Sequence, residues 1–456
     1  MRPSTVRGRG RLARVAESIE SRLWPLPVAA IAAAVVLGIL LPRLDLIVDS
    51  DLPIGVDSVV FNGGAETARS VLSSIAGSLI TATSLTFSLT VVALQLASSQ
   101  ASPRVLRLFS RDRQVHVTLA VFLGTFAYAI TVLRSIRDST DDDPEFVPRI
   151  AVTVGFALTL VSVIMLVFFL AHLAAQLRVE TIMKEIHAET DRTIDLVGDS
   201  QAAVTAFEGR ITLPEHREVV RADSSGFVTS VDRLGLLRFA TDHGIVVQET
   251  KRVGESIVAG TPQAFWWVAG GLADPTGPGG APEPAEVDEA VRRAMSIGYE
   301  RTAAQDVDYG VQQILDIGVR ALSAGINDPT TAVNALGHLG ALLARAVALP
   351  ALPTGLASED GRLGVVTASR SAAEFVRDSL TPMRHYGAGD PAVVTRLLQT
   401  VSDLAYCCPD RPVVEALLEQ LSALERQLAR DESDPSEAAR LLQATEALSI
   451  RLRSTI

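Results

Sequence analysis

The sequence predicts a mainly α-helical membrane protein, with four transmembrane helices followed by a cytoplasmic part that combines a small β-rich module and a helical bundle. Three observations support this fold class. Four apolar segments carry no Asp, Glu, Lys or Arg, and each approaches or exceeds the roughly 20 helical residues that a bilayer requires. Short β-rich runs come next, and the last third of the chain repeats apolar residues at helical spacing.

The N-terminal part divides into a basic leader and a membrane domain. The first apolar segment ends without a small-residue cleavage site, so we expect a retained signal anchor, not a removed signal peptide. The expected boundaries are 1–23 for the leader and 24–178 for the membrane domain, with spans at 24–41, 71–97, 115–133 and 150–171.

Charges on the connecting segments predict the orientation. The leader is rich in Arg, the connection between the second and third spans carries Arg104, Arg107, Arg111 and Arg113, and Arg178 and Lys184 follow the fourth span. The other two connections are acidic, with Asp45 in one and the triplet 141–143 in the other. Because positive residues remain inside, we expect both termini in the cytoplasm and the protein in the inner (cell) membrane of a bacterium.

The second span carries small and hydroxyl residues on one helical stripe. Two interpretations remain open. Such a stripe allows close helix packing in lipid, or it lines a polar path. The titratable residues near the bilayer, His116 and His172, fall at the cytoplasmic boundary, which disfavours a proton relay through the membrane. The stripe consists of Ser74, Gly77, Ser78, Thr81, Ser84, Ser88 and Gln95.

The cytoplasmic part is expected in four sections: a helical stalk at 179–207, a β-rich module at 208–272, a Pro/Gly linker at 273–286 and a helical domain at 287–456. Within the module, strands are expected at 218–221, 226–231, 245–249, 256–258 and 265–268, with one helix at 233–243. In the helical domain, Pro329 after Asp328 is a strong helix start. The expected helices are 306–322, one that starts at Pro329, 373–379, 392–405, 412–429 and 435–452.

One polar cluster of the helical domain is a candidate binding site. Three interpretations remain open: a capped helix–turn–helix with a structural Arg–Asp pair, a site for a small anion or nucleotide at exposed helix N–H groups, and an interface contact. The cluster consists of Gln305, Asp306, Arg320, Asn327, Asp328, Thr330 and Thr331.

Several function classes find no support. The net charge of −11 argues against a nucleic-acid partner. No phosphate-binding loop, zinc-protease motif, calcium loop or nucleophile elbow occurs, so we expect no enzyme activity, no cofactor and no metal. His187 follows the last span, where sensor kinases carry a phospho-accepting histidine, but nothing downstream reads as a nucleotide-binding domain.

Two segments together resemble a bacterial family of predicted membrane proteins of unknown function. They are SLITATSLTFSLTVVALQLASSQASPR at 78–104 and RALSAGINDPTTAVNAL at 320–336. The chain departs from the family pattern at Ala324, where Pro often stands, and this affects only the rigidity of the turn. The resemblance supports the topology and implies no catalytic residues.

These observations favour a channel-like or transport-related protein that contacts the lipid bilayer, forms a homo-oligomer and takes an unidentified small anion or ion. In this interpretation the second span lines the path and the cytoplasmic part regulates it. The alternative is a membrane-anchored sensor or scaffold with no permeation path.

Overall fold

The computed structural model describes residues 24–48, 61–100, 112–137, 145–269, 282–430 and 434–454. It divides into two compact units, Met1–Thr181 and Ile182–Ile456, here called the membrane unit and the C-terminal unit. The expected mainly α fold class with four membrane helices and β structure is confirmed. The basic leader, residues 104–111, the triplet 141–143 and most of the expected linker lie outside the described residues.

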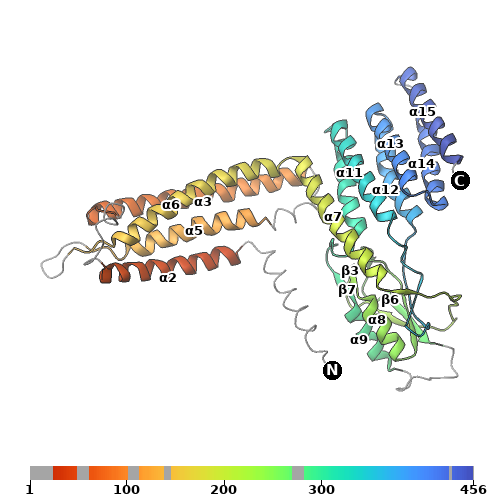
Figure 1. Ribbon diagram of the computed structural model, residues 1–456, viewed down its shortest axis with the longest axis horizontal. Coiled ribbons are helices and arrows are strands. Elements are labelled where there is room, and N and C mark those ends of the chain that lie inside the picture. Colours follow the sequence, from red (N-terminus) through yellow and green to blue (C-terminus); the bar gives the residue numbers. More distant parts are fainter. Residues whose placement is uncertain are drawn as a thin grey trace. The chain divides into compact units, whose positions relative to one another are not determined.

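In its described residues, the membrane unit has four helices that lie alongside one another (Figure 1). Within the described residues, these four are long and apolar enough to cross a membrane. Each is longer than the expected span, because polar residues at the ends continue the helix beyond the apolar stretch. They are α2 (Pro25–Val48), α3 (Ala65–Gln100), α5 (Arg113–Leu133) and α6 (Arg149–Gln176).

Helix α5 occupies the centre of this unit, in contact with α2, α3 and α6. About 61% of its most apolar stretch of 18 residues is buried inside the unit, against 17% of the corresponding stretch in each of the other three helices. The buried core joins Leu72 of α3, Phe122 and Tyr128 of α5 and Val152 of α6. The Tyr128 hydroxyl donates to the carbonyl of Ala151 at 2.8 Å, which satisfies this buried polar group.

Two carboxylates from other segments cap the first turns of α3 and α6. Asp45, buried in the last turn of α2, accepts from the backbone N–H groups of Ile150 at 3.0 Å and Ala151 at 3.1 Å. Glu145 accepts from the N–H of Ala65 at 2.7 Å. The starts of α3 and α6 therefore lie at the same end of the unit, and these two helices run in the same direction.

The C-terminal unit contains two β-sheets. The six-stranded sheet has the order β1-β8-β9-β4-β6-β2, and the three-stranded sheet has the order β5-β3-β7. The strands are β1 (Thr205–Ala206), β2 (Glu218–Arg221), β3 (Gly226–Val231), β4 (Ile245–Glu249), β5 (Ser256–Ile257), β6 (Pro262–Val268), β7 (Met295–Gly298), β8 (Gly355–Ala357) and β9 (Leu363–Val366).

These sheets extend beyond the β-rich module expected at 208–272. Strands β7, β8 and β9 come from later sequence, and β4 pairs in parallel with β9 through Val247 and Val365. Helix α9 (Pro284–Ala294) begins inside the expected linker, with Pro284 in its first turn. It packs with α8 (Arg233–Asp242) around a core that contains Trp266 and Val287.

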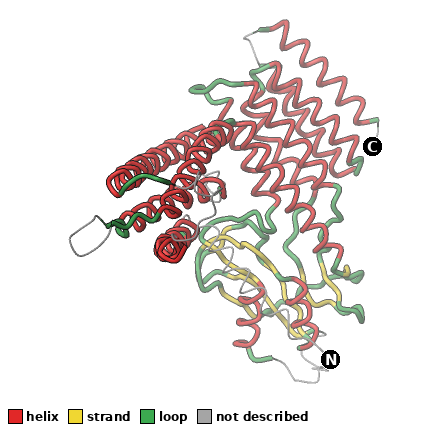
Figure 2. Tube along the Cα trace, turned by 60° about the vertical axis from the view of Figure 1, so that its left-hand side comes forward, coloured by secondary structure: helices red, strands yellow, loops and turns green. Residues whose placement is uncertain are grey.

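The remaining helices form three hairpins in two layers. In one layer α10 contacts α12 and α12 contacts α14, and in the other α11 contacts α13 and α13 contacts α15 (Figures 1 and 2). The hairpins are α10 (Val307–Ala321) with α11 (Pro329–Val347), α12 (Ala372–Gly387) with α13 (Pro391–Cys407), and α14 (Arg411–Leu428) with α15 (Pro435–Arg453). Helix α7 (Val179–Ala202), the expected stalk, packs on this bundle through its residues after Ile182.

Candidate functional sites: a polar membrane stripe and a charged pocket

Every member of the predicted stripe on α3 is exposed in the single chain. The opposite face of the helix is buried, with Leu72, Ile75 and Leu79 in the core of the membrane unit. The structure therefore turns the stripe away from the helices of its own chain. Among the described residues, no atom lies within 4 Å of a Cβ built at Gly77, so this position is open.

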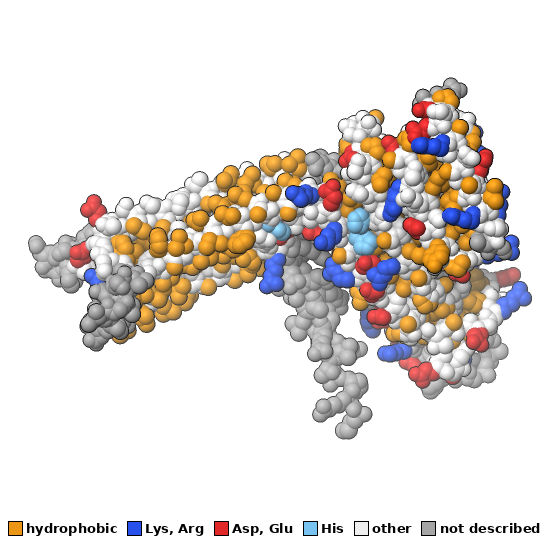
Figure 3. Space-filling model, turned by 45° about the horizontal axis from the view of Figure 1, so that its top comes forward, with side chains coloured by type: hydrophobic (Ala, Val, Ile, Leu, Met, Phe, Trp, Pro, Cys, Tyr) orange, Lys and Arg blue, Asp and Glu red, His pale blue; other side chains and the backbone are white. Residues whose placement is uncertain are grey.

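Helices α2 and α6 provide the comparison. Every exposed residue of α2 between Leu26 and Leu40 is apolar, and so is every exposed residue of α6 between Phe156 and Ala175. Hydrophobic side chains accordingly predominate along the helices of this unit on the face drawn in Figure 3. Within the described spans, the small and hydroxyl surface belongs to α3.

The stripe is as long as a bilayer is thick. Ser74 and Gln95 are 21 residues apart, which is about 32 Å at 1.5 Å per residue, against a hydrocarbon core of about 30 Å. Several hydroxyls donate to their own helix: Ser74 to the carbonyl of Ser70 at 2.8 Å and Thr81 to that of Gly77 at 3.0 Å. This lowers the cost of placing the hydroxyls in a membrane and leaves their oxygens available as acceptors.

The polar cluster predicted in the helical domain is divided between the two ends of α10. At the start, Gln305 accepts from the N–H of Val231 at 2.9 Å, and Asp306 caps the helix by accepting from the N–H of Tyr309 at 3.0 Å. Arg320 lies in the last turn, about 20 Å further along a 15-residue helix. These residues therefore do not form a single site.

The second half of the cluster is the turn between α10 and α11. Both carboxylate oxygens of Asp328 accept from Thr331, one from its N–H at 3.1 Å and one from its hydroxyl at 2.6 Å. These hydrogen bonds hold the pKa of Asp328 below its ordinary value. Asn327 adopts a left-handed conformation, with φ +50°, at the position that allows the chain to enter α11. Thr330 is exposed in the first turn. The arrangement is a capped helix–turn–helix.

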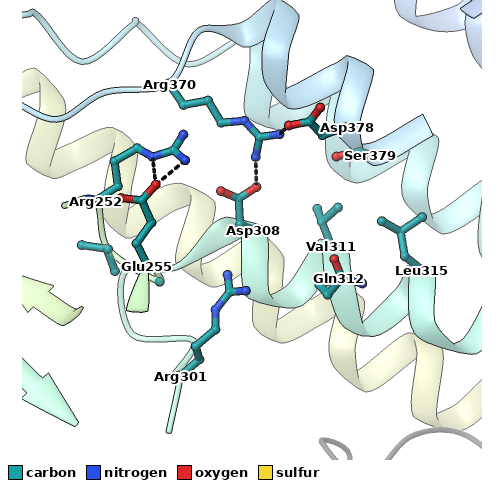
Figure 4. A pocket seen from close by; sticks show the side chains of 12 residues that line it. Arg252, Glu255, Arg301, Asp308, Val311, Gln312, Leu315, Arg370, Asp378 and Ser379 are labelled. Atoms are coloured by element: carbon teal, nitrogen blue, oxygen red, sulfur yellow. Dashed lines mark hydrogen bonds and ion pairs between the residues drawn. The ribbon is translucent and has the colours of Figure 1, made fainter. Parts of the chain in front are cut away.

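A different polar site, which the sequence does not reveal, is a cavity of about 280 Å³ in the C-terminal unit (Figure 4). It lies where the β4–β5 turn meets the start of α10 and the start of α12. One face of α10 contributes Val311 and Leu315. The charged side chains that line it are Arg252, Glu255, Arg301, Asp308, Arg370 and Asp378.

Ion pairs hold these side chains in place. Arg370 donates to Asp308 at 2.7 Å and to Asp378 at 2.5 Å, and its side chain is 16% exposed, so it links the start of α10 to α12. Arg252 donates to Glu255 at 2.6 Å. Burial raises the pKa of Glu255, but the hydrogen bonds and charge of Arg252 outweigh it and hold the pKa below its ordinary value. The Glu255 carboxylate is therefore stabilised in its charged form beside Arg252.

A glycine makes the turn at this cavity. Gly254 has φ +89°, and a Cβ there would lie 2.8 Å from Cγ of Asp306 and 2.9 Å from Nη2 of Arg301. Arg301 in turn binds both oxygens of Asp306, at 2.8 and 2.9 Å. The close approach brings the β4–β5 turn against the start of α10. Sequence reasoning missed this site because its segments are separated by up to about 120 residues and carry no motif.

Comparison with known proteins shows the family. The chain belongs to the family described as "Predicted membrane protein (DUF2254)", whose model matches residues 20–403. Uncharacterised proteins of Mycobacterium tuberculosis and Mycobacterium bovis are 32% identical over 432 residues, which is 94% of this chain and 80% of the relatives. No solved structure matches. The resemblance noted from the sequence is thus confirmed.

Proposed function

We propose that this protein is a non-enzymatic, homo-oligomeric inner-membrane protein with both termini in the cytoplasm, in which α3 of each copy lines a path for a small polar solute or ion. The proposal rests on the contrast between exposed faces: those of α2 and α6 are apolar, whereas α3 has an exposed stripe of small and polar residues that is about as long as a membrane is thick.

The two kinds of exposed helix face suit different surroundings. Lipid tails suit the outer faces of α2 and α6, whereas a stripe of glycine and hydroxyls gives lipid little dispersion contact and invites a second helix or water. Large apolar residues, Ile80 and Val91 on one side and Leu85 and Val92 on the other, are exposed beside the stripe. Packing of copies through these flanks places the stripes toward a common axis.

A cysteine-accessibility experiment tests the path. Ser84 of α3 and Val167 of α6 both lie twelve residues beyond the contact of Leu72 with Gly155, so they have similar depth on helices that run in the same direction. Each is replaced by Cys in a chain whose own cysteines, Cys407 and Cys408, are changed to Ser. We expect a water-soluble thiol reagent to modify Ser84→Cys and alter solute flux from liposomes, and to leave Val167→Cys unmodified.

The variant Ser88→Arg provides the second measurement. A path lined by α3 predicts changed flux with the assembly intact, because the added charge faces water. Equal labelling of the Ser84→Cys and Val167→Cys variants, together with no flux from the wild type under ion or osmotic gradients, contradicts the proposal. A Ser88→Arg protein that only loses its oligomeric mass indicates a packing stripe without a path.

The charged pocket favours a second candidate, a membrane-anchored sensor. Its three guanidinium groups and three carboxylates suit a small ligand that carries both signs of charge. A thermal-shift screen of amino acids and phosphorylated metabolites on the whole protein tests this. We expect stabilisation that is lost in Arg252→Gln and kept in Arg440→Gln, whose residue pairs with Glu437 outside the pocket. An unchanged melting temperature throughout contradicts it.

A further inference from the structure

Two histidines from separate helices face each other in the C-terminal unit. His187 lies on α7 and His338 on α11, 151 residues later, and their Nδ1 atoms are 3.1 Å apart. The rings meet edge to face, with centroids 5.0 Å apart. Both side chains are partly buried, so the pair is sheltered yet reachable from solvent.

The carboxylate of Asp191 lies near the other ring nitrogen of His187. Nε2 of His187 lies 3.5 Å from Oδ2 of Asp191, and Oδ1 of Asp191 lies 2.7 Å from Nη1 of Arg345. A proton on Nε2 suits this carboxylate, and a neutral His187 then turns the lone pair of Nδ1 toward His338. Asp191, which is ion-paired with Arg345, is thereby placed to orient the ring of His187, as carboxylates beside metal-binding histidines do.

We propose that His187 and His338 together bind a divalent transition-metal ion, with Zn²⁺ as the model ion, through their Nδ1 atoms. In a tetrahedral zinc site with Zn–N bonds of 2.0–2.1 Å, two ligand nitrogens are about 3.3 Å apart. The 3.1 Å separation is within a few tenths of an ångström of that value. Among the described residues no group of three or more His, Cys, Asp or Glu can hold an ion, so water completes the coordination.

The donor atoms select the class of metal. Imidazole nitrogen suits Zn²⁺, Ni²⁺ and Cu²⁺, whereas Mg²⁺ and Ca²⁺ require oxygen ligands. Imidazole coordinates a metal ion in its neutral form, through the ring nitrogen that carries no proton. The sequence indicated no metal because the two ligands lie on different helices without a spacing motif.

The bound ion fastens α7 to α11. Two residues separate the start of α7 from the end of α6, so α7 is the segment that leads from the last span into the C-terminal unit. Thr193, six residues after His187, also anchors α7 by donating to the carbonyl of Ala303 at 2.6 Å. Metal occupancy therefore strengthens an existing contact and requires no rearrangement of the fold.

Isothermal titration of the full-length protein, purified in detergent without a histidine tag and stripped with chelator, tests the site. We expect one equivalent of Zn²⁺ or Ni²⁺ per chain, and at least tenfold weaker binding in His187→Gln and in His338→Gln. Asp191→Asn should weaken binding by about 10- to 100-fold, as loss of such orienting carboxylates does. His243→Gln is the matched control, since His243 contacts the carbonyl of Phe239 elsewhere in the unit.

The outcome of these binding measurements does not depend on the outcome of the flux experiments. Melting temperatures measured without metal show whether each variant is folded, and Mg²⁺ shows whether the effect is that of any divalent ion. Stoichiometric Zn²⁺ binding that His187→Gln and His338→Gln abolish supports the site. No binding at millimolar Zn²⁺, or equal binding by wild type and both variants, overturns it and leaves the pair as a hydrogen bond between neutral imidazoles.

Discussion

The variant Gly77→Leu distinguishes between a monomer that is surrounded by lipid and a protein that assembles through α3. In the single chain, a Cβ at this position meets none of the described residues within 4 Å. Leucine is therefore accommodated without a clash, and the helix gains, because Gly in an exposed helix interior is about 1 kcal/mol less favourable than a good helix former. If the protein is a monomer, Gly77→Leu should therefore be slightly more stable than the wild type.

An assembly in which the stripes themselves pack against one another predicts the reverse. A helix that packs against Gly77 leaves no room for a leucine side chain, and overpacking of this kind costs about 1–3 kcal/mol at each contact. Every 1.4 kcal/mol is a tenfold change in a dissociation constant, so an interface repeated around a ring is broken readily. For stripes that pack together, the expected result is smaller particles with the fold of each chain unchanged. For the proposed path, in which copies join through the apolar flanks, the expected result is the wild-type mass with reduced flux, because the leucine narrows the path.

Gly155 is the matched control. It lies on α6 inside the single chain, where a Cβ would be 3.3 Å from Cδ2 of Leu72 and 3.5 Å from Cε1 of Tyr128. Gly155→Leu should lower the melting temperature of the chain itself. Light scattering after size-exclusion chromatography, together with thermal melting, measures both effects. If Gly77→Leu retains the wild-type mass and flux, the assembly inferred from the exposed stripe is refuted.

Three further predictions concern the C-terminal unit. The Glu249 side chain is fully buried and bound by Arg233 at 2.9 Å, so Glu249→Leu should cost about 3–5 kcal/mol in chemical denaturation, and the double variant with Arg233→Met should recover most of it. Asp328→Ala should cost about 1 kcal/mol as a lost N-cap, while Asp328→Asn retains the cap. Because the folded pKa of Asp328 is lowered, its contribution is present above the ordinary Asp pKa of about 3.9 and is lost as the pH falls through the folded pKa, a loss that Asp328→Asn should not show. Gly310→Ala should destabilise the packing of α7 on α10, because its Cβ would lie 2.8 Å from that of Thr190; an unchanged melting temperature would contradict this.

Local patterns predicted the individual elements well. Strands β2, β3 and β4 begin and end at the expected residues, and the ends of α13 and α14 lie within one or two residues of expectation, because alternation and helical spacing are properties of adjacent sequence. Strands β8 and β9 were missed for the converse reason. They have three and four residues, and their place in the sheet depends on pairing across more than a hundred residues, of β9 with β4 and of β8 with β1.

The same distinction separates the two candidate sites. The stripe of α3 was predictable because its members share one helix, but periodicity gives only their relative direction, and the structure was needed to show that they face outward. The pocket was not predictable, because Arg370 meets Asp308 only after the β4–β9 pairing has brought the start of α12 beside α10. The cap at Asp328 was read correctly as a helix start, and its distance from Asp306 follows from the length of α10 alone.

The exposed face of α3 also constrains how a path would work. The hydroxyls of Ser74, Ser78 and Thr81 donate to their own backbone, so these side chains present acceptor oxygens without a fixed charge. Acceptor oxygens replace water around a cation better than around an anion, and no Asp, Glu, Lys or Arg lies within the stripe to select by charge. A path of this composition therefore discriminates by size and hydration, and in flux measurements it should favour small cations and neutral polar solutes over anions of equal size.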